Sequence, residues 1–264
     1  MFVFDETIIG HKGTLPKVIG ERRASGGGTI NVIQKRERAL GSYIPFSTLD
    51  GRTPFRVFIT NEKTCGKWMT PEDPIVPAEE KGLRETPHRL FLSSETGYVS
   101  TELFTCIMDD FTNWWTTTNP GVDCLLISDN LAIHKNKAIV AKAEDRGIHM
   151  LNIIPGSSHW FQVHDQQPFA VLKKKLISSF YDIFSGNTVD PEAMMELRLA
   201  KLYEAEREAL KPSAVLKACE YVGLSPWNPS LIRENCKKHY LPILAQSRGT
   251  SLTTYPEESA CISK

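Results

Sequence analysis

The sequence predicts an α/β fold in which a mixed sheet is flanked by helices, and three observations support this prediction. Short, β-prone apolar runs separated by turn signals fill residues 1–60, as expected for successive antiparallel strands. Residues 122–154 follow the pattern of a buried strand, a helix and a second buried strand. Helical patterns fill most of the chain after residue 165. Antiparallel strands, a βαβ unit and further helices combine in a layered α/β arrangement.

The first part of the chain is expected to contribute four strands. Each is rich in β-branched or aromatic residues, and Asp50-Gly51 is a turn signal that joins the last two as a hairpin. The expected strands are residues 1–4, 28–33, 40–48 and 52–60. Residues 62–94 hold four prolines among charged residues, so we expect a long loop or insertion with little regular structure.

The middle of the chain changes to a helical period at Ser100. Apolar residues recur every three or four positions from Leu103 to Trp115, and Ser100 supplies an N-cap. Two short, nearly all-apolar runs then predict strands covered on both faces, and the helix between them is expected to end at Gly147. The strands are expected at residues 122–128 and 148–154, and the helix at 135–146.

Three more helices are expected towards the C-terminal end. The first has one apolar face, formed by Phe169, Leu172, Leu176, Phe180 and Ile183. The others are expected over residues 191–210 and 213–223, each bounded by proline or glycine. We therefore expect an ordered domain over residues 1–235, followed by a disordered tail over residues 236–264.

The composition is that of an ordinary globular protein. Of the 264 residues, 41% are hydrophobic, which is enough for a sizeable core in one large domain or two small ones. No signal-peptide pattern and no apolar run near the ~18 residues of a membrane span is found, so we expect a soluble intracellular protein without a membrane partner. The six cysteines form no CxxC pair, which gives no support to a zinc cluster or a disulfide framework. Basic and acidic residues number 31 each, which argues against nucleic-acid binding through bulk charge alone.

Three aspartates follow elements of the expected sheet. Asp5 ends the first strand, Asp129 ends the strand at 122–128, and Asp165 lies at the start of a helix after the next strand. Each could serve only as a turn or capping residue, and Asp165 could simply cap its helix. If the first strand lies beside the strand that ends at Asp129, two carboxylates converge on one sheet edge. Clustered carboxylates repel one another, so a bound hard cation accounts best for such a set.

Three blocks of sequence carry a resemblance to a known family. They are MFVFDETIIG, LLISDNLAIH and LNIIPGSSHWFQVHDQQPFAVLKK, and SPWNPSLI follows them near the C-terminal end. In this order and spacing they resemble the catalytic domain of DDE/DDD transposases of the mariner superfamily, in the pogo/Tigger/Jerky branch, over roughly residues 1–235.

The resemblance implies a ribonuclease-H-like fold with Asp5, Asp129 and Asp165 as the catalytic, metal-binding triad. Mg²⁺ is the implied cofactor, with Mn²⁺ able to substitute, because carboxylates suit hard cations. Two such ions would clamp a phosphodiester, so that hydrolysis frees the 3′ end of the element and the same site joins that end to target DNA. DNA is thus the implied partner and the nucleus the implied location, while a homodimer is left open.

Four more residues match the family's motifs and are expected near the site. They are Asn130, His134, His159 and Gln162. The chain departs from the family at Leu131 and Ile133, and at Val163-His164, where the family has Pro-Leu. A histidine beside a metal-binding aspartate could tune the site or add a ligand, and the alternative is an exposed loop residue.

Two groups of basic residues are candidate contacts to DNA phosphates, the alternative being solvated surface. They are Lys12, Arg22, Arg23, Lys35 and Arg36 in the N-terminal part, and Lys173, Lys174 and Lys175 later. Family members normally carry helix-turn-helix modules upstream, and this chain opens on the expected first catalytic strand. We therefore expect the recognition domain for the terminal repeats to be absent from this chain.

Three functions are compatible with these residues. The leading hypothesis is a metal-dependent transposase domain that cuts and joins DNA. The second is a domesticated copy that keeps the fold as a DNA- or chromatin-binding module without catalysis. The third, a metallohydrolase using His134, His159, His164 and Asp165, is the weakest because the sequence has no HxH or HExxH spacing.

Overall fold

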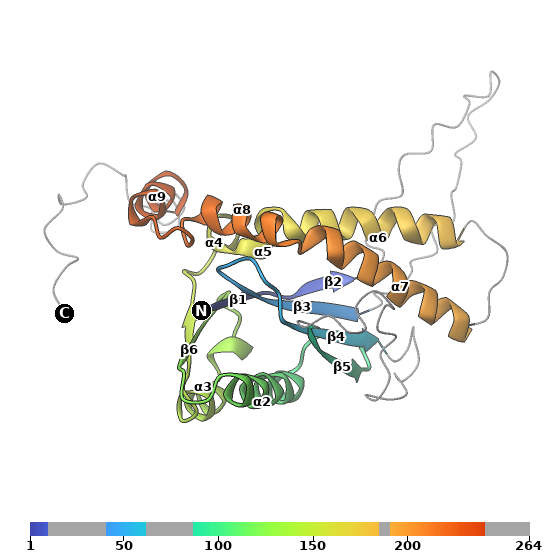
Figure 1. Cartoon of the computed structure of the whole chain (residues 1–264), viewed down its shortest axis with the longest axis horizontal. Helices are drawn as coiled ribbons and strands as arrows, with labels where there is room; N and C mark the ends of the chain where they lie inside the picture. Colours follow the sequence, from blue (N-terminus) through green and yellow to red (C-terminus); the bar gives the residue numbers. More distant parts are fainter. Residues whose placement is uncertain (10–40, 62–86, 185–190, 241–264) are drawn as a thin grey trace, which may run out of the picture.

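The computed structural model describes residues 1–9, 41–61, 87–184 and 191–240 (Figure 1). Its strands are β1 (Phe2–Phe4), β2 (Thr7–Ile9), β3 (Gly41–Thr48), β4 (Phe55–Asn61), β5 (His88–Ser94), β6 (Cys124–Ser128) and β7 (Ile148–Asn152). They form one sheet in the order β5-β4-β3-β1-β6-β7, and β2 also pairs with β3. The pairings are antiparallel for β1, β2 and β4 with β3, and parallel for the others. The expected mixed sheet is confirmed.

Helices cover both faces of this sheet. They are α2 (Thr101–Thr118), α3 (Lys137–Glu144), α4 (Ser158–Phe161), α5 (Val163–Gln166), α6 (Pro168–Phe184), α7 (Pro191–Ala209), α8 (Pro212–Val222) and α9 (Pro229–Asn235), with short helical turns η2 (Ile133–Lys135) and η3 (Cys236–Tyr240). Figure 1 shows α2 and α3 on one side of the sheet and α6, α7 and α8 on the other. This α/β arrangement is consistent with a ribonuclease-H-like fold.

The extended chain at the N-terminal end is interrupted between β1 and β2, where Asp5 lies. β1 and β2 lie along the same neighbour, β3, and two residues, Asp5 and Glu6, separate them. The register places this interruption opposite Pro45 and the residue before it. Proline has no backbone N–H to donate to a ladder, which accounts for a break at this place. Asp5 is thereby released from strand pairing in the middle of the sheet.

One strand lies where a loop was expected. The prediction of little regular structure over 62–94 was wrong for the last seven residues, which form β5 parallel to β4 from His88 to Ser94. Only Phe91 is buried among them, so the local pattern of this edge strand is weak. Its stability comes from pairing with β4, a non-local contact that residues 88–94 do not themselves encode. Residues 62–86 and the expected strand at 28–33 lie outside the described residues.

The βαβ unit and the N-capped helix before it are confirmed. Ser100 accepts a hydrogen bond from the Leu103 N–H at 3.2 Å, and β6 and β7 pair in parallel on either side of α3. β7 differs from the expected strand because alternate residues, His149 and Leu151, face solvent. β7 lies at the edge of the sheet, and its outer face is left uncovered there.

The C-terminal helices begin and end close to the expected residues, with one difference at the domain boundary. Cys236–Tyr240 form the turn η3 directly after α9, so the tail expected from residue 236 begins too early. Residues 241–264 lie outside the described residues, as do the side chains of Phe180 and Ile183. No helix in the described part of the chain is both long enough and apolar enough to span a membrane.

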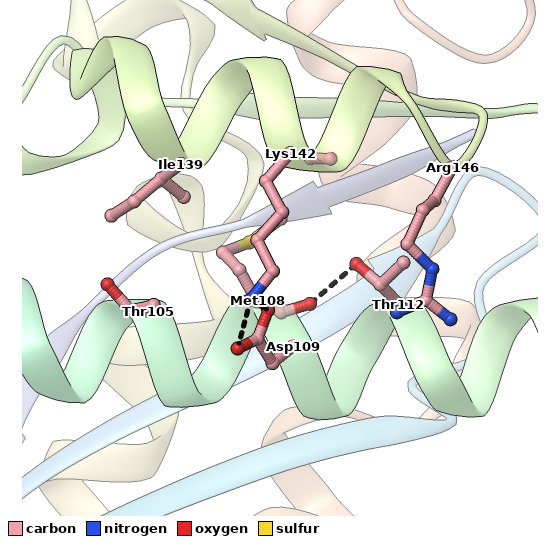
Figure 2. A pocket seen from close by; sticks show the side chains of 8 residues that line it. Thr105, Met108, Asp109, Thr112, Ile139, Lys142 and Arg146 are labelled. Atoms are coloured by element: carbon pink, nitrogen blue, oxygen red, sulfur yellow. Dashed lines mark hydrogen bonds and ion pairs between the residues drawn. The ribbon is translucent and has the colours of Figure 1, made fainter.

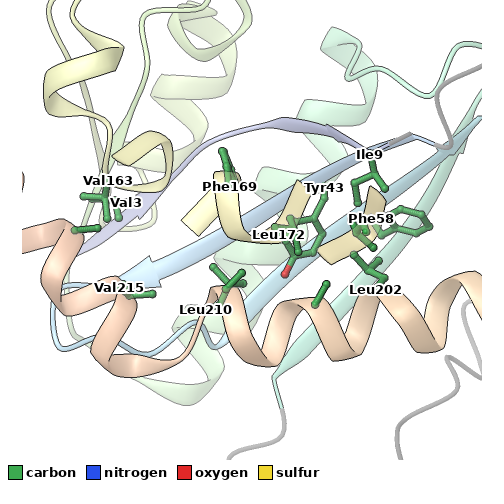
Figure 3. Packing of buried hydrophobic residues seen from close by; sticks show 14 of the residues in the cluster. Val3, Ile9, Tyr43, Phe58, Val163, Phe169, Leu172, Leu202, Leu210 and Val215 are labelled. Atoms are coloured by element: carbon green, nitrogen blue, oxygen red, sulfur yellow. The ribbon is translucent and has the colours of Figure 1, made fainter. Parts of the chain in front are cut away.

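Alternation along β1 divides the core between the two faces of the sheet. Phe2 and Phe4 point towards α2, where Phe4 stacks on Phe46 with ring centroids 4.7 Å apart. Val3 points to the opposite face and joins a cluster under α6, α7 and α8 (Figure 3). Other members of this second cluster are Tyr43, Phe58, Phe169, Leu172, Leu202 and Val215. The strand that carries Asp5 is therefore fixed from both sides.

Candidate functional site

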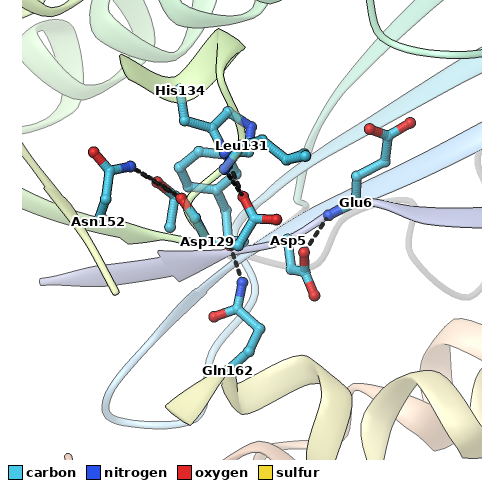
Figure 4. Close-up of polar contacts among 9 residues, drawn as sticks. Asp5, Glu6, Asp129, Leu131, His134, Asn152 and Gln162 are labelled. Carbon is cyan, nitrogen blue, oxygen red and sulfur yellow. Dashed lines mark hydrogen bonds and ion pairs between the residues drawn. The ribbon is translucent and has the colours of Figure 1, made fainter. Parts of the chain in front are cut away.

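Asp5 occupies the break between β1 and β2 and is almost fully buried. Its Oδ1 accepts a hydrogen bond from the Glu6 N–H at 2.9 Å. The Gln162 side chain reaches the same place and donates from Nε2 to the Phe4 carbonyl oxygen at 2.9 Å (Figure 4). A carboxyl group at the end of a central strand, with an amide side chain held beside it, is well placed to meet a ligand.

Asp129 follows β6, the parallel neighbour of β1. The pairing of Val3 with Ile127, continued by two residues, brings Asp5 and Asp129 side by side at the carboxyl ends of the two strands. The Oδ1 atom of Asp129 lies 2.6 Å from Nδ1 of His134 and accepts the Leu131 N–H at 3.2 Å. Figure 4 shows both carboxyl groups at this edge.

The backbone at Asp129 is also held in place. The Asn152 amide at the end of β7 donates to the Asp129 carbonyl oxygen at 3.0 Å and to the Ser128 hydroxyl at 2.8 Å. His134 is buried between two aromatic rings, with centroid distances of 5.0 Å to Phe4 and 4.7 Å to Phe104. The carboxylate of Asp129 therefore has a fixed partner on a rigid support.

Asp165 lies on α5 and is exposed, and its charge acts on the Asp5 carboxyl group. Burial raises the pKa of Asp5 to about 8, and repulsion from Asp165 and then from Asp129 adds to the increase. The pKa of Asp165 is raised mainly by partial burial and less by Asp129, while His159 and Lys173 oppose the shift. Asp5 is therefore the carboxyl group on which the charges of the other two act.

The three aspartates do not form a closed ligand cage. Within the described residues, no three His, Cys, Asp or Glu side chains are gathered closely enough to hold a metal ion. The donor set nevertheless suits a hard cation, because it consists of carboxylates whose mutual repulsion a cation would relieve. Asp5 and Asp129 are the residues that would hold a divalent ion, and Asp165 would have to approach them to complete the set.

The other predicted neighbours of the site occupy different positions. Gln162 is fully buried, and its Oε1 atom has no hydrogen-bond partner among the described residues. His159 is exposed on α4, where its ring meets that of Trp160 edge-on, with ring centroids 6.4 Å apart. Asn130 is half-buried directly after Asp129. Of these four predicted neighbours, only Gln162 and His134 have a side-chain hydrogen bond at the site, Gln162 to the Phe4 carbonyl and His134 to Asp129.

His164 is not an exposed loop residue. Its side chain is fully buried, stacks on Phe169 with centroids 5.3 Å apart, and is hydrogen-bonded through Nε2 to the Ser47 hydroxyl at 2.8 Å. Burial lowers the pKa of His164 to about 3, so the ring is neutral. The alternative of an exposed loop residue was therefore wrong, and Nε2 of His164 is engaged by Ser47. An influence of His164 on the site stays a prediction.

The sequence analysis did not predict a role for two serines near the site, Ser47 and Ser42. Ser47 on β3 is hydrogen-bonded to His164, and Ser42 on the same strand donates a hydrogen bond to the Glu6 carboxylate. The signal in the sequence was the presence of two serines in the strand GSYIPFST, at positions that both turned out to be buried. A buried hydroxyl needs a partner, and in both cases the partner lies in or beside the Asp5 and Asp165 segments.

The candidate DNA contacts are only partly described. Lys12, Arg22, Arg23, Lys35 and Arg36 lie outside the described residues. Lys173, Lys174 and Lys175 are exposed on α6, and Lys173 is close enough to Asp165 to influence its pKa. Lys175 forms an ion pair with Glu208 at 2.8 Å. A basic edge therefore adjoins one of the three aspartates.

A shallow pocket lies away from these residues, between α2 and α3 (Figure 2). Its walls include Met108, Ile139 and Arg146, and an ion pair of 2.6 Å between Lys142 and Asp109 crosses it. None of the predicted site residues lines it.

Comparison with known proteins gave no relative. No protein-family model, no curated protein and no solved structure matches the chain.

Proposed function

We propose that this chain is the catalytic domain of a nuclear, Mg²⁺-dependent DNA transposase, which cuts phosphodiester bonds at the ends of a DNA element and joins them to target DNA. The observation that carries the proposal is the convergence of Asp5 and Asp129 at the carboxyl ends of neighbouring parallel strands. Electrostatic coupling of both to Asp165 supports it. The resemblance of the three sequence blocks supplies the substrate class.

The described side chains have separable tasks in this proposal. Asp5 and Asp129 supply oxygen ligands, and His134 holds one carboxylate oxygen of Asp129 through the 2.6 Å contact. Gln162 fixes the backbone at Phe4, directly before Asp5. When bound, divalent ions would activate the attacking oxygen and stabilise the leaving one. In this proposal Lys173, near Asp165, would hold a phosphate of the DNA strand.

A second candidate is a domesticated domain that binds DNA or chromatin without cutting it. The exposed position of Asp165, outside a closed cage in the described part of the chain, favours this candidate. The basic edge on α6 serves DNA binding in either case, so binding alone does not separate the two functions.

Nicking of supercoiled plasmid DNA in Mg²⁺ or Mn²⁺ separates them. We expect the wild-type protein to cut only with metal, and Asp129→Asn to lower the rate at least about 100-fold, because metal ions contribute several kcal/mol at the transition state. Asp123→Asn is the matched control, since Asp123 precedes β6 as Asp129 follows it and its side chain is 77% exposed. Metal-independent cutting, or equal rates for both variants, would contradict the proposal. Folded protein that binds DNA but never cuts it would support the domesticated function.

A further inference from the structure

Two side chains at the start of α5 tie this helix to the sheet. Gln162 bonds to the Phe4 carbonyl on β1, and His164 bonds to the Ser47 hydroxyl on β3. We propose that His164 is a positioning residue, which fixes α5, and with it the backbone at Asp165, over β3 through the hydrogen bond to Ser47. This inference rests on the proposed metal-dependent function, because the relation between Asp165 and Asp5 matters most when both serve one cation.

The hydrogen bond belongs to a short buried chain. The Ser47 hydroxyl is bonded to His164 Nε2 at 2.8 Å and to the Thr53 hydroxyl at 2.9 Å. All three side chains are buried, and the ring of Phe169 lies against the imidazole. A hydrogen bond enclosed in this way is strong and directional, so it sets where the backbone of α5 lies over β3.

The two residues of the sheet that hold α5 are Phe4 and Ser47, here called its anchors, and their positions allow them to control the site. In the β1–β3 register, Val3 pairs with Ser47 and Phe4 with Phe46, so the anchors of α5 are adjacent positions on paired strands. Phe4, the anchor on β1, directly precedes Asp5. Ser47, the anchor on β3, is hydrogen-bonded to His164, which directly precedes Asp165. A shift of α5 along β3 would therefore move Asp165 relative to Asp5.

Packing alone gives a poor account of a histidine at this position. The Nδ1 atom of His164 is buried without a hydrogen-bond partner among the described residues, which destabilises the folded state. A leucine would fill similar space against Phe169 without burying an unpaired nitrogen. The family that the chain resembles has leucine in this position. What histidine offers beyond leucine is the bond to Ser47.

The test compares Mn²⁺ affinity of the whole chain, measured by isothermal titration calorimetry, across variants of this bond. We expect His164→Leu and Ser47→Ala to weaken binding by about 10-fold or more, as is typical when the partners of metal ligands are removed. His164→Gln, whose amide reaches as far as Nε2, should stay within about 3-fold of the wild type. Hydrogen exchange of the α5 amides without metal should become faster for the leucine and alanine variants and not for the glutamine variant.

Two controls separate the possible failures. Thr112→Val removes another buried hydrogen bond, from the Thr112 hydroxyl to the Met108 carbonyl on α2, and should leave Mn²⁺ affinity unchanged. Asp129→Asn should abolish Mn²⁺ binding. Wild-type affinity in His164→Leu, with Asp129→Asn still defective, would overturn the positioning role and leave the proposed function intact. Absence of Mn²⁺ binding by the wild type, or binding indifferent to Asp129, would overturn both.

Discussion

Glu206 shows how a single buried charge links a helix to the sheet. It lies on α7 with its side chain 2% exposed, and its Oε2 is 2.7 Å from an Arg56 nitrogen and 3.3 Å from an Arg89 nitrogen. The guanidinium of Arg89 also lies over the ring of Tyr203, 4.6 Å from its centroid. The carboxylate thus balances charges from β4 and β5 at the place where α7 crosses them.

Removal of this carboxylate should be costly. We expect Glu206→Gln to lower the free energy of unfolding by about 3 kcal/mol, because the buried ion pairs of Glu206 with Arg56 and Arg89 are broken. Glu204→Gln, two residues earlier on the same helix, removes an exposed partner of Lys201 and should cost less than about 1 kcal/mol. Urea denaturation of the two variants gives the comparison. Equal losses would show that the buried pair adds nothing beyond a surface pair.

At single positions, the sequence indicated which residues lie near the site more reliably than it indicated how deeply each side chain is buried. Strand β1 does lie beside β6, which brings Asp5 and Asp129 together, because strand ends and βαβ topology follow from local patterns. Asp165 as the third member of the set stays a prediction. The burial of His164 could not be read in this way. It depends on Ser47, which is more than a hundred residues away in the chain and becomes a neighbour only through folding.

The β3–β4 hairpin is an element whose stability depends on a titratable group. In its turn, the Asp50 carboxylate accepts hydrogen bonds from Arg52 at 2.6 and 3.0 Å and from the Thr48 hydroxyl. Hydrogen bonding from Arg52 is the main cause that lowers the pKa of Asp50 to about 2. The folded state therefore favours the charged carboxylate.

Stability contributed by Asp50 should follow pH accordingly. Since the folded pKa lies below the unfolded one, the contribution is present above about pH 4 and is lost as the pH falls towards 2. We expect Asp50→Asn to be less stable than the wild type by under about 1 kcal/mol near neutral pH, because the group is largely exposed. The difference should shrink between about pH 4 and pH 2 in urea denaturation curves. A difference that grows in acid would contradict the assigned cause.

Among the elements, those with their own periodicity were predicted and those defined by a partner were not. Helix α2 and the βαβ unit were confirmed from apolar spacing and the Ser100 cap. Strand β5 was missed because only one of its seven residues is buried and its hydrogen bonds go to β4. Strand β7 was expected to be buried on both faces, but its place at the sheet edge depends on topology that the local pattern does not contain.

On the scale of the whole molecule, the sheet separates two apolar clusters that must form together. Cys124 belongs to the cluster under α2 and α3, and Cys219 to the cluster under α6, α7 and α8. Burial raises the pKa of each of these thiols to about 11. Cys106, by contrast, is exposed on α2. Because the thiolate is the reactive form, the two buried cysteines report on opening of the core.

Cysteine labelling should therefore show one cooperative unit. Near pH 8, an alkylating reagent followed by peptide mass spectrometry should label Cys106 rapidly in the native protein. Labelling of Cys124 and Cys219 should be slower by orders of magnitude and should rise at the same urea concentration, because both faces share one sheet. Separate midpoints for Cys124 and Cys219 would show that the two halves of the core unfold independently.

The central position of β1 also governs the order in which the molecule can assemble during biosynthesis. β1 can pair early with β3, which follows β2 in the chain, but its parallel partner β6 leaves the ribosome roughly 120 residues after β1. Until then one edge of β1, with Asp5 beyond its end, has no neighbour. The nascent chain therefore holds an open strand edge until β6 emerges, and the two carboxylates of the sheet meet only once the βαβ unit has formed.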